Sequence, residues 1–277
     1  MRKGLLLVLN TLNASINRMI PLEAPELPGM EDFFPEPFLF EGTPFEFNRI
    51  MLVRMVAVVF ICLLFGIGAS RVKLVPGRFQ GALEMALQVV RVNVAEAVIE
   101  SPVLARRYTP ALTVIFFGIL ALNLTGIVPL LHIAGSSVVG VPIVFAVFAY
   151  VLFVGAGIRA QGFGHFFKNQ LFPPGVPWPI YFLLTPVEAF STFVVRPATL
   201  VIRLLANMIA GHILLALTFF GTHYLLFYAS GLLKGVSVLT FGASILVVLL
   251  EILVAVVQAF VFSLLTAVYI QLSVSEH

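Results

Sequence analysis

Charged residues and cysteine are scarce in this sequence. Only 10% of its 277 residues are charged, whereas soluble domains carry about 25%. Cys62 is the single cysteine, which excludes an intramolecular disulfide. Glycine-rich phosphate loops and clusters of metal-ligating residues are also lacking, so we expect no cofactor, no metal site and no nucleotide chemistry on this chain. The formal net charge of +3 is too small and too scattered to indicate nucleic-acid binding.

Long apolar runs dominate what is present. Hydrophobic residues make up 60% of the sequence, and the mean hydropathy is +1.08. Several segments reach the roughly 18 apolar residues of a membrane-spanning helix: residues 50–70, 111–131, 141–158, 180–228 and 236–272. We therefore predict an all-α membrane protein with about five membrane-crossing or long tilted helices. The last two segments are too long for a hydrocarbon core of about 30 Å, so each is a tight re-entrant pair or one steeply tilted helix.

An amphipathic helix is predicted between the first two spans, over residues 77–108. Its apolar residues recur at helical spacing and its polar residues share another face. The apolar set is Leu83, Leu87, Val90, Val94 and Ala97, and the polar set is Glu84, Gln88 and Arg91. Such a helix is expected to lie along the membrane surface rather than to cross it. Pro110 is expected to begin the next span.

The first 49 residues are predicted to form an acidic, proline- and phenylalanine-rich tail outside the membrane. This segment has no helical period and cannot bury a core of its own. Residues 50–277 are predicted to form a single helical membrane domain. Basic residues gather before the second span and after the third, and the positive-inside rule assigns both loops to the cytoplasm. The N-terminus is then outside and, after an odd number of crossings, the C-terminus is cytoplasmic.

The most informative stretch is residues 197–212, which read P-A-T-L-V-I-R-L-L-A-N-M-I-A-G-H. Arg203 stands here inside an apolar run, where an ionised side chain costs about 2.5–3.5 kcal/mol on insertion scales. A guanidinium cannot escape this cost by losing its proton. Asn207 lies one helical turn beyond Arg203 on the same side, and His212 lies on roughly the opposite face. The stretch indicates a function that needs a permanent positive charge.

The last two predicted spans contain three further polar residues of interest, Glu188 in residues 180–228 and Glu251 and Gln258 in residues 236–272. Glu251 and Gln258 are seven residues apart and therefore lie on one face of a helix. A glutamate and an arginine on neighbouring intramembrane helices indicate either a proton path or a structural salt bridge that holds the helices together. Glu188 is either structural or pore-lining. A secondary transporter with an intramembrane Arg/Glu/His site is the alternative function, although such proteins normally show inverted repeats, and none is found.

Three motifs together resemble subunit a of the F-type ATP synthases. I-R-L-L-A-N-M-I-A-G-H, residues 202–212, is similar to that family's signature around its essential arginine. V-V-Q-A-F-V-F-S-L-L-T-A-V-Y-I, residues 256–270, resembles the signature of its last helix. L-N-L-T-G-I-V-P, residues 122–129, resembles a third family stretch. The resemblance extends from about residue 44 to the C-terminus and leaves out the acidic tail.

The resemblance implies roles for the residues that match these motifs. Arg203 matches the arginine that faces the carboxylate of each rotor c subunit, and Asn207 matches the polar residue one turn on. His212 and Glu251 match a pair that meets in one aqueous half-channel, here with the two residue types exchanged relative to many bacterial members. Gln258 matches the glutamine near the arginine. Glu188, whose match is looser, completes the expected ion-translocation residues.

The resemblance also implies partners and a location. The expected partners are the ring of c subunits, the b-type subunits of the peripheral stalk, the lipid bilayer and protons. The subunit is expected to be a non-catalytic, proton-conducting stator in a bacterial plasma membrane, which couples ion flow to rotation and ATP synthesis. The two long segments are then expected to be tilted helices that curve around the rotor.

Overall fold

The computed structural model describes residues 47–70, 72–73, 76–128, 139–171, 178–228 and 232–275, and helices dominate these ranges. Five of the described helical stretches are long and apolar enough to cross a membrane. Together with a surface helix they confirm the predicted all-α membrane fold. The predicted acidic tail lies, apart from residues 47–49, outside the described residues.

The first span is helix α2, Arg49–Ser70. Asn48 begins it by accepting a hydrogen bond of 3.0 Å from the backbone N–H of Met51, as an N-cap residue does. The buried residues of α2 all lie in its first half, and most of its other apolar side chains are exposed. Exposed apolar side chains on such a helix are suited to contact with lipid.

The amphipathic segment is shorter than predicted. Helix α3, Arg78–Val90, continues as the π-helical stretch η2, Arg91–Glu96, and helix α4, Pro102–Leu124, begins after a break. Ser101 is extended there, with ψ 116°, because a residue before proline is pushed out of the helical region. The predicted start of the second span at Pro110 is wrong, since this proline lies inside α4. Membrane helices tolerate an internal proline when neighbouring groups satisfy the freed backbone.

The third span, helix α5, Gly140–Gln161, is followed directly by the short helix α6, Phe163–Leu171. Gly162 joins them with φ +82°, a conformation that side-chain-bearing residues rarely adopt. The turn folds Phe166 back onto Gly157 of α5, where an added Cβ would overlap the phenyl ring. The same Cβ would lie 2.9 Å from the Ser273 carbonyl oxygen, so glycine permits close packing of three helices.

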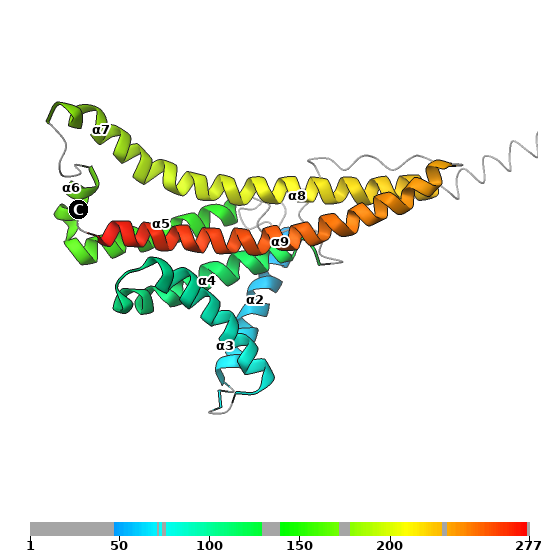
Figure 1. The fold of residues 1–277 in the computed structure, drawn as a ribbon, viewed down its shortest axis with the longest axis horizontal. Helices are drawn as coiled ribbons and strands as arrows, with labels where there is room; N and C mark the ends of the chain where they lie inside the picture. The colour runs from blue at the N-terminus through cyan, green and yellow to red at the C-terminus, as the bar shows by residue number, and fades with distance from the viewer. Residues whose placement is uncertain are drawn as a thin grey trace, which may run out of the picture.

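The last two apolar segments are long helices and not re-entrant pairs. Helix α7, Trp178–Phe190, passes through the π-helical turn η3, Ser191–Val195, into helix α8, Arg196–Phe227. Helix α9, Leu232–Val274, has 43 residues. Figure 1 shows α8 and α9 side by side along their length, with α7 bending away at the end near the chain's C-terminus. This arrangement confirms the long-helix alternative.

The core lies where α4, α5, α8 and α9 meet, with η2 packed against one side. Its members are apolar residues of less than 8% exposure, among them Leu112, Ile115, Phe153, Leu204, Phe262 and Ile270. Phe153 also packs edge-on against Tyr269 of α9. This shared core fixes the register of α8 against α9, and it is this register that brings the polar residues of the two helices together.

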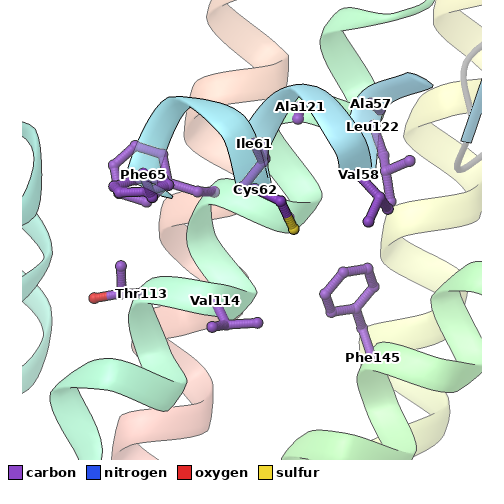
Figure 2. Close-up of a pocket in the computed structure, with 12 residues that line it drawn as sticks. Ala57, Val58, Ile61, Cys62, Phe65, Thr113, Val114, Ala121, Leu122 and Phe145 are labelled. Atoms are coloured by element: carbon purple, nitrogen blue, oxygen red, sulfur yellow. The ribbon is translucent and has the colours of Figure 1, made fainter. Parts of the chain in front are cut away.

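An apolar cavity of about 370 Å³ lies between α2, α4 and α5. Figure 2 shows the side chains of Val58 and Cys62 on α2 and of Val114 and Phe145 across from them around one space. No charged residue lines this cavity. It is suited to hydrocarbon, and it is separate from the residues that carry charge.

Candidate ion-translocation site

The side chains of α8 and α9 meet in a hydrogen bond between amides. Asn207 Nδ2 donates to Gln258 Oε1 at 2.8 Å. Gln258 is only 4% exposed, and its Nε2 has no hydrogen-bond partner among the described residues. A buried amide is costly when it is left unbonded, so this seam has an unsatisfied donor next to the predicted site.

A pocket of about 210 Å³ lies beside Asn207. Its polar lining comes from three helices: Asn123 of α4, Asn207 and His212 of α8, and Glu251 of α9. Asn123 and His212 are buried, with 1% and 8% exposure. The structure therefore brings His212 and Glu251 into one cavity, which is the juxtaposition that a proton relay requires.

The absence of a side chain at Gly211 makes room for the Glu251 carboxylate. A Cβ placed on Gly211 would lie 2.6 Å from Glu251 Oε1, closer than Cβ atoms occur in real proteins. Glycine at this position thus lets the carboxylate rest against the α8 backbone between Asn207 and His212. Small residues are used in this way where membrane helices approach closely.

Arg203 lies on the opposite, open face of α8. The buried residues of this helix form one stripe toward the core, namely Leu200, Leu204, Met208, His212 and Leu215. Arg203, Ala206, Asn207 and Ala210 are exposed on the other side. Arg203 forms no salt bridge with any carboxylate of the described residues, Glu251 included. The charge is presented outward, on a face with small neighbours that a helix from another subunit can approach.

Glu188 lies apart from the pocket. It belongs to α7, on the other side of the turn η3 from α8. Its Oε1 is 3.8 Å from the guanidinium of Arg196, and the two residues flank the turn η3. The sequence spacing gave no partner for Glu188, because eight residues of regular helix do not return to the same face. The π-helical turn supplies the missing register shift.

The structure thus joins four of the predicted residues, Asn207, His212, Glu251 and Gln258, in one neighbourhood. Arg203 is one helical turn from Asn207 but faces outward, and Glu188 is separate. Asn123 belongs to the pocket and was not predicted as a site residue, although a polar side chain in an apolar span was a usable signal. Across the described ranges, no group of three His, Cys, Asp or Glu residues is placed to hold a metal ion.

The sequence is similar to a known protein family over most of its length. Residues 50–271 match the family model described as ATP synthase A chain. The sequence is 42% identical over 252 residues to ATP synthase subunit a of Rhodococcus erythropolis, covering 90% of this chain and 91% of the relative. It is 39% identical over 244 residues to the protein of the same name in Pseudarthrobacter chlorophenolicus, covering 88% and 91%. A third relative of that name, from Frankia alni, is 37% identical over 224 residues, covering 80% and 76%.

Proposed function

This chain belongs to the ATP synthase A chain family, and we propose that it forms the two half-channels through which protons reach and leave the rotor of an F-type ATP synthase. The family and the apolar helices make it a multi-pass protein of the bacterial plasma membrane. The observation that carries the proposal is the outward-facing charge of Arg203 within a membrane-spanning helix, one turn from a polar pocket.

The partner of Arg203 is a ring of c subunits that carry carboxyl groups at bilayer depth. A carboxyl group in lipid is neutral, because burial disfavours its charged form. When rotation brings it to Arg203, the fixed positive charge favours the ionised form, and the carboxyl releases its proton. The small residues Ala206 and Ala210 beside Arg203 allow the ring's helices to approach this face closely.

The pocket beside Asn207 is the inner end of one half-channel. Glu251 and His212 each take up and release a proton, and both line this cavity together with Asn123. A proton that enters from the outer side passes along this pair and protonates the next rotor carboxylate. The amide pair of Asn207 and Gln258 holds the two helices in register at the point of transfer.

The second half-channel opens on the opposite side of Arg203, at the end of the helix that carries Glu188. Protons that rotor carboxyls release near Arg203 leave by this route. Because Arg203 separates the two routes, its charge opposes a direct leak of protons from one to the other. Each elementary charge that crosses about 100 mV supplies about 2.3 kcal/mol, so several protons are needed for each nucleotide made.

The remaining assignments follow from this scheme. Residues 50–277 form one membrane domain, and residues 1–49 form an external acidic tail. The N-terminus is outside and the C-terminus is cytoplasmic, which assigns the half-channel of Glu251 to the outside and that of Glu188 to the cytoplasm. The b-type subunits of the peripheral stalk hold the chain stationary while the c ring turns.

The deciding experiment compares the native complex with Arg203→Ala in inverted membrane vesicles. With the catalytic head attached, ATP-driven proton pumping is expected to fall to background in the variant. With the head stripped, passive proton conduction is expected to persist, because the positive barrier has gone while the two polar routes remain. Arg203→Lys is expected to pump poorly as well, since lysine lacks the planar guanidinium and loses its proton more easily when buried.

Two controls separate the channel from an anchor. The variant complexes must retain the c ring on purification, so that a loss of pumping is not a loss of assembly. Gly155→Ala in α5, which does not carry Arg203, has open space around the new methyl group and is expected to pump normally. Normal coupled pumping by Arg203→Ala would refute the proposed function.

A further inference from the structure

Between α7 and α8, the described helix is interrupted by one π-helical turn, η3. Such turns are rare and occur frequently at functional sites. Within it, Thr192 is fully buried, and its hydroxyl has no hydrogen-bond partner among the described residues. The unbonded hydroxyl of Thr192 lowers the stability of the folded chain. A structural effect of η3 that offsets this loss is therefore expected.

The effect of η3 is to change which residues of α7 and α8 lie on the same face, and it brings Glu188 and Arg196 together. In a regular α-helix, two residues eight positions apart point about 80° away from each other. A π-helical turn takes up one extra residue, so that Glu188 and Arg196 are related as if they were seven positions apart, about 20° from the same face. The carboxylate of Glu188 consequently reaches the guanidinium of Arg196, with 3.8 Å between Oε1 and Nη2.

Arg196 is held on its other side by the last helix. Its guanidinium carbon lies 5.5 Å from the ring centroid of Tyr269 in α9, a cation–π geometry. Tyr269 is itself fixed by an edge-on contact with Phe153 of α5. The planar guanidinium can stack on a ring and face a carboxylate at the same time, so Arg196 connects the rigid α5–α9 core to Glu188.

Neither member of the pair is fully enclosed by this chain. The Glu188 side chain is 33% exposed and that of Arg196 is 19% exposed. The carboxylate therefore keeps one side that water or another group can reach while Arg196 contacts the other. The effect of the pair is on where the carboxylate lies, because Glu188 precedes Arg203 by 15 residues, about four helical turns, and Arg196 lies between them.

We propose that Arg196, supported by Tyr269 and brought into register by the η3 turn, is the residue that positions the Glu188 carboxylate to accept the protons that rotor carboxyls release near Arg203. This inference rests on the proposed function, and it adds Arg196 to the residues that serve the proton path. In each transfer Glu188 gains one proton at a carboxylate oxygen and returns it to water on the cytoplasmic side. Arg196 exchanges no proton, and it acts through its contact with Glu188.

The test is a double-mutant cycle in the assembled complex. ATP-driven proton pumping is measured in inverted vesicles for native protein, Glu188→Gln, Arg196→Gln and the double variant, normalised to the amount of c ring retained. We expect Arg196→Gln to lower the pumping rate by about the same factor as Glu188→Gln. The double variant is expected to equal Glu188→Gln, because a positioning residue has no effect once its carboxylate is gone.

Two conservative variants distinguish positioning from bulk packing. Arg196→Lys keeps the positive charge and is expected to recover most of the lost rate. Tyr269→Phe keeps the ring face and is expected to pump normally, whereas Tyr269→Leu removes the ring and is expected to resemble Arg196→Gln. A structural role for Arg196 would not produce this pattern.

Several outcomes would overturn the proposal. These are an unchanged rate in Glu188→Gln or in Arg196→Gln, multiplicative losses in the double variant, or no recovery with lysine. Arg203→Ala in the same preparation separates this failure from a failure of the proposed function. If Arg203→Ala abolishes pumping while the cycle fails, the role of Arg196 is refuted and the central role of Arg203 stands; normal pumping by Glu188→Gln would in addition refute the role of Glu188.

Discussion

Asn207 and Gln258 are 51 residues apart in the sequence, and their side-chain amides meet in a hydrogen bond of 2.8 Å between α8 and α9. The two residues differ in exposure: Asn207 is exposed on the face that carries Arg203, whereas Gln258 is buried. The hydrogen bond therefore links the face that the rotor is proposed to approach with the interior of the helix pair.

Gln258→Leu removes the acceptor of Asn207 while it nearly preserves side-chain volume. Interhelical hydrogen bonds in membranes contribute only about 0.6 kcal/mol on average, so we expect the complex to assemble normally. Proton pumping is expected to fall several-fold, because Asn207 can then turn away from the pocket. Thr266→Val is the control, since its buried hydroxyl bonds only to the carbonyl of Phe262 in its own helix. Equal rates in the two variants would contradict the role given to Gln258.

Gly211→Ala adds a methyl group 2.6 Å from Glu251 Oε1 and must displace the carboxylate. A misplacement of about 1 Å at a reacting group can cost up to about 100-fold in rate, so we expect a fall in pumping of at least about tenfold. Gly155→Ala in α5, where nothing lies within 4 Å of the added atom, is the matched control. Passive conduction by head-stripped vesicles measures the same step without ATP. Comparable rates in the two alanine variants would show that the contact is unimportant.

Glu251→Gln keeps the shape of the side chain and removes its ability to carry a proton. We expect slower proton flux in both directions with an intact complex, because His212 would be left without its relay partner in the pocket. Ser244→Ala, one buried position two turns away on the same helix, is expected to leave the flux unchanged. An unaltered rate in Glu251→Gln would return this glutamate to a structural role.

Gly157→Ala tests the packing of α5 against α6 and α9 rather than the ion path. The new methyl group would overlap the Phe166 ring and lie 2.9 Å from the Ser273 carbonyl. Overpacking of this kind typically costs about 1–3 kcal/mol, so we expect a lower temperature of thermal dissociation in detergent. Gly155→Ala, with open space around its added atom, is expected to match the native protein.

The helical spans were predictable because lipid demands apolar runs whose backbone bonds are satisfied within one segment. The surface helix was predictable from its amphipathic period, but its end was not. Local rules set the break at Ser101, before Pro102, whereas Pro110 was accepted inside α4. A single sequence does not reveal which of two prolines a membrane helix will tolerate, because neighbouring helices decide it.

The polar site was predictable as a set of residues and not as an arrangement. Arg203 and Glu251 stood out because charge at bilayer depth is expensive. The contact between Asn207 and Gln258 depends on how far α9 slides along α8, which the shared core determines. The pairing of Glu188 with Arg196 depends on a single π-helical turn, and helical periodicity read at 3.6 residues per turn conceals it.

The outward direction of Arg203 has a consequence for biogenesis. A newly inserted copy of this chain that has not met its ring must hold an unneutralised cation against hydrocarbon, at a cost of about 2.5–3.5 kcal/mol. In the proposed complex the ring's carboxylates would partner that charge, so the lone subunit would be the less stable species. The charge that is proposed to keep the two routes apart would thereby also disfavour the unassembled subunit.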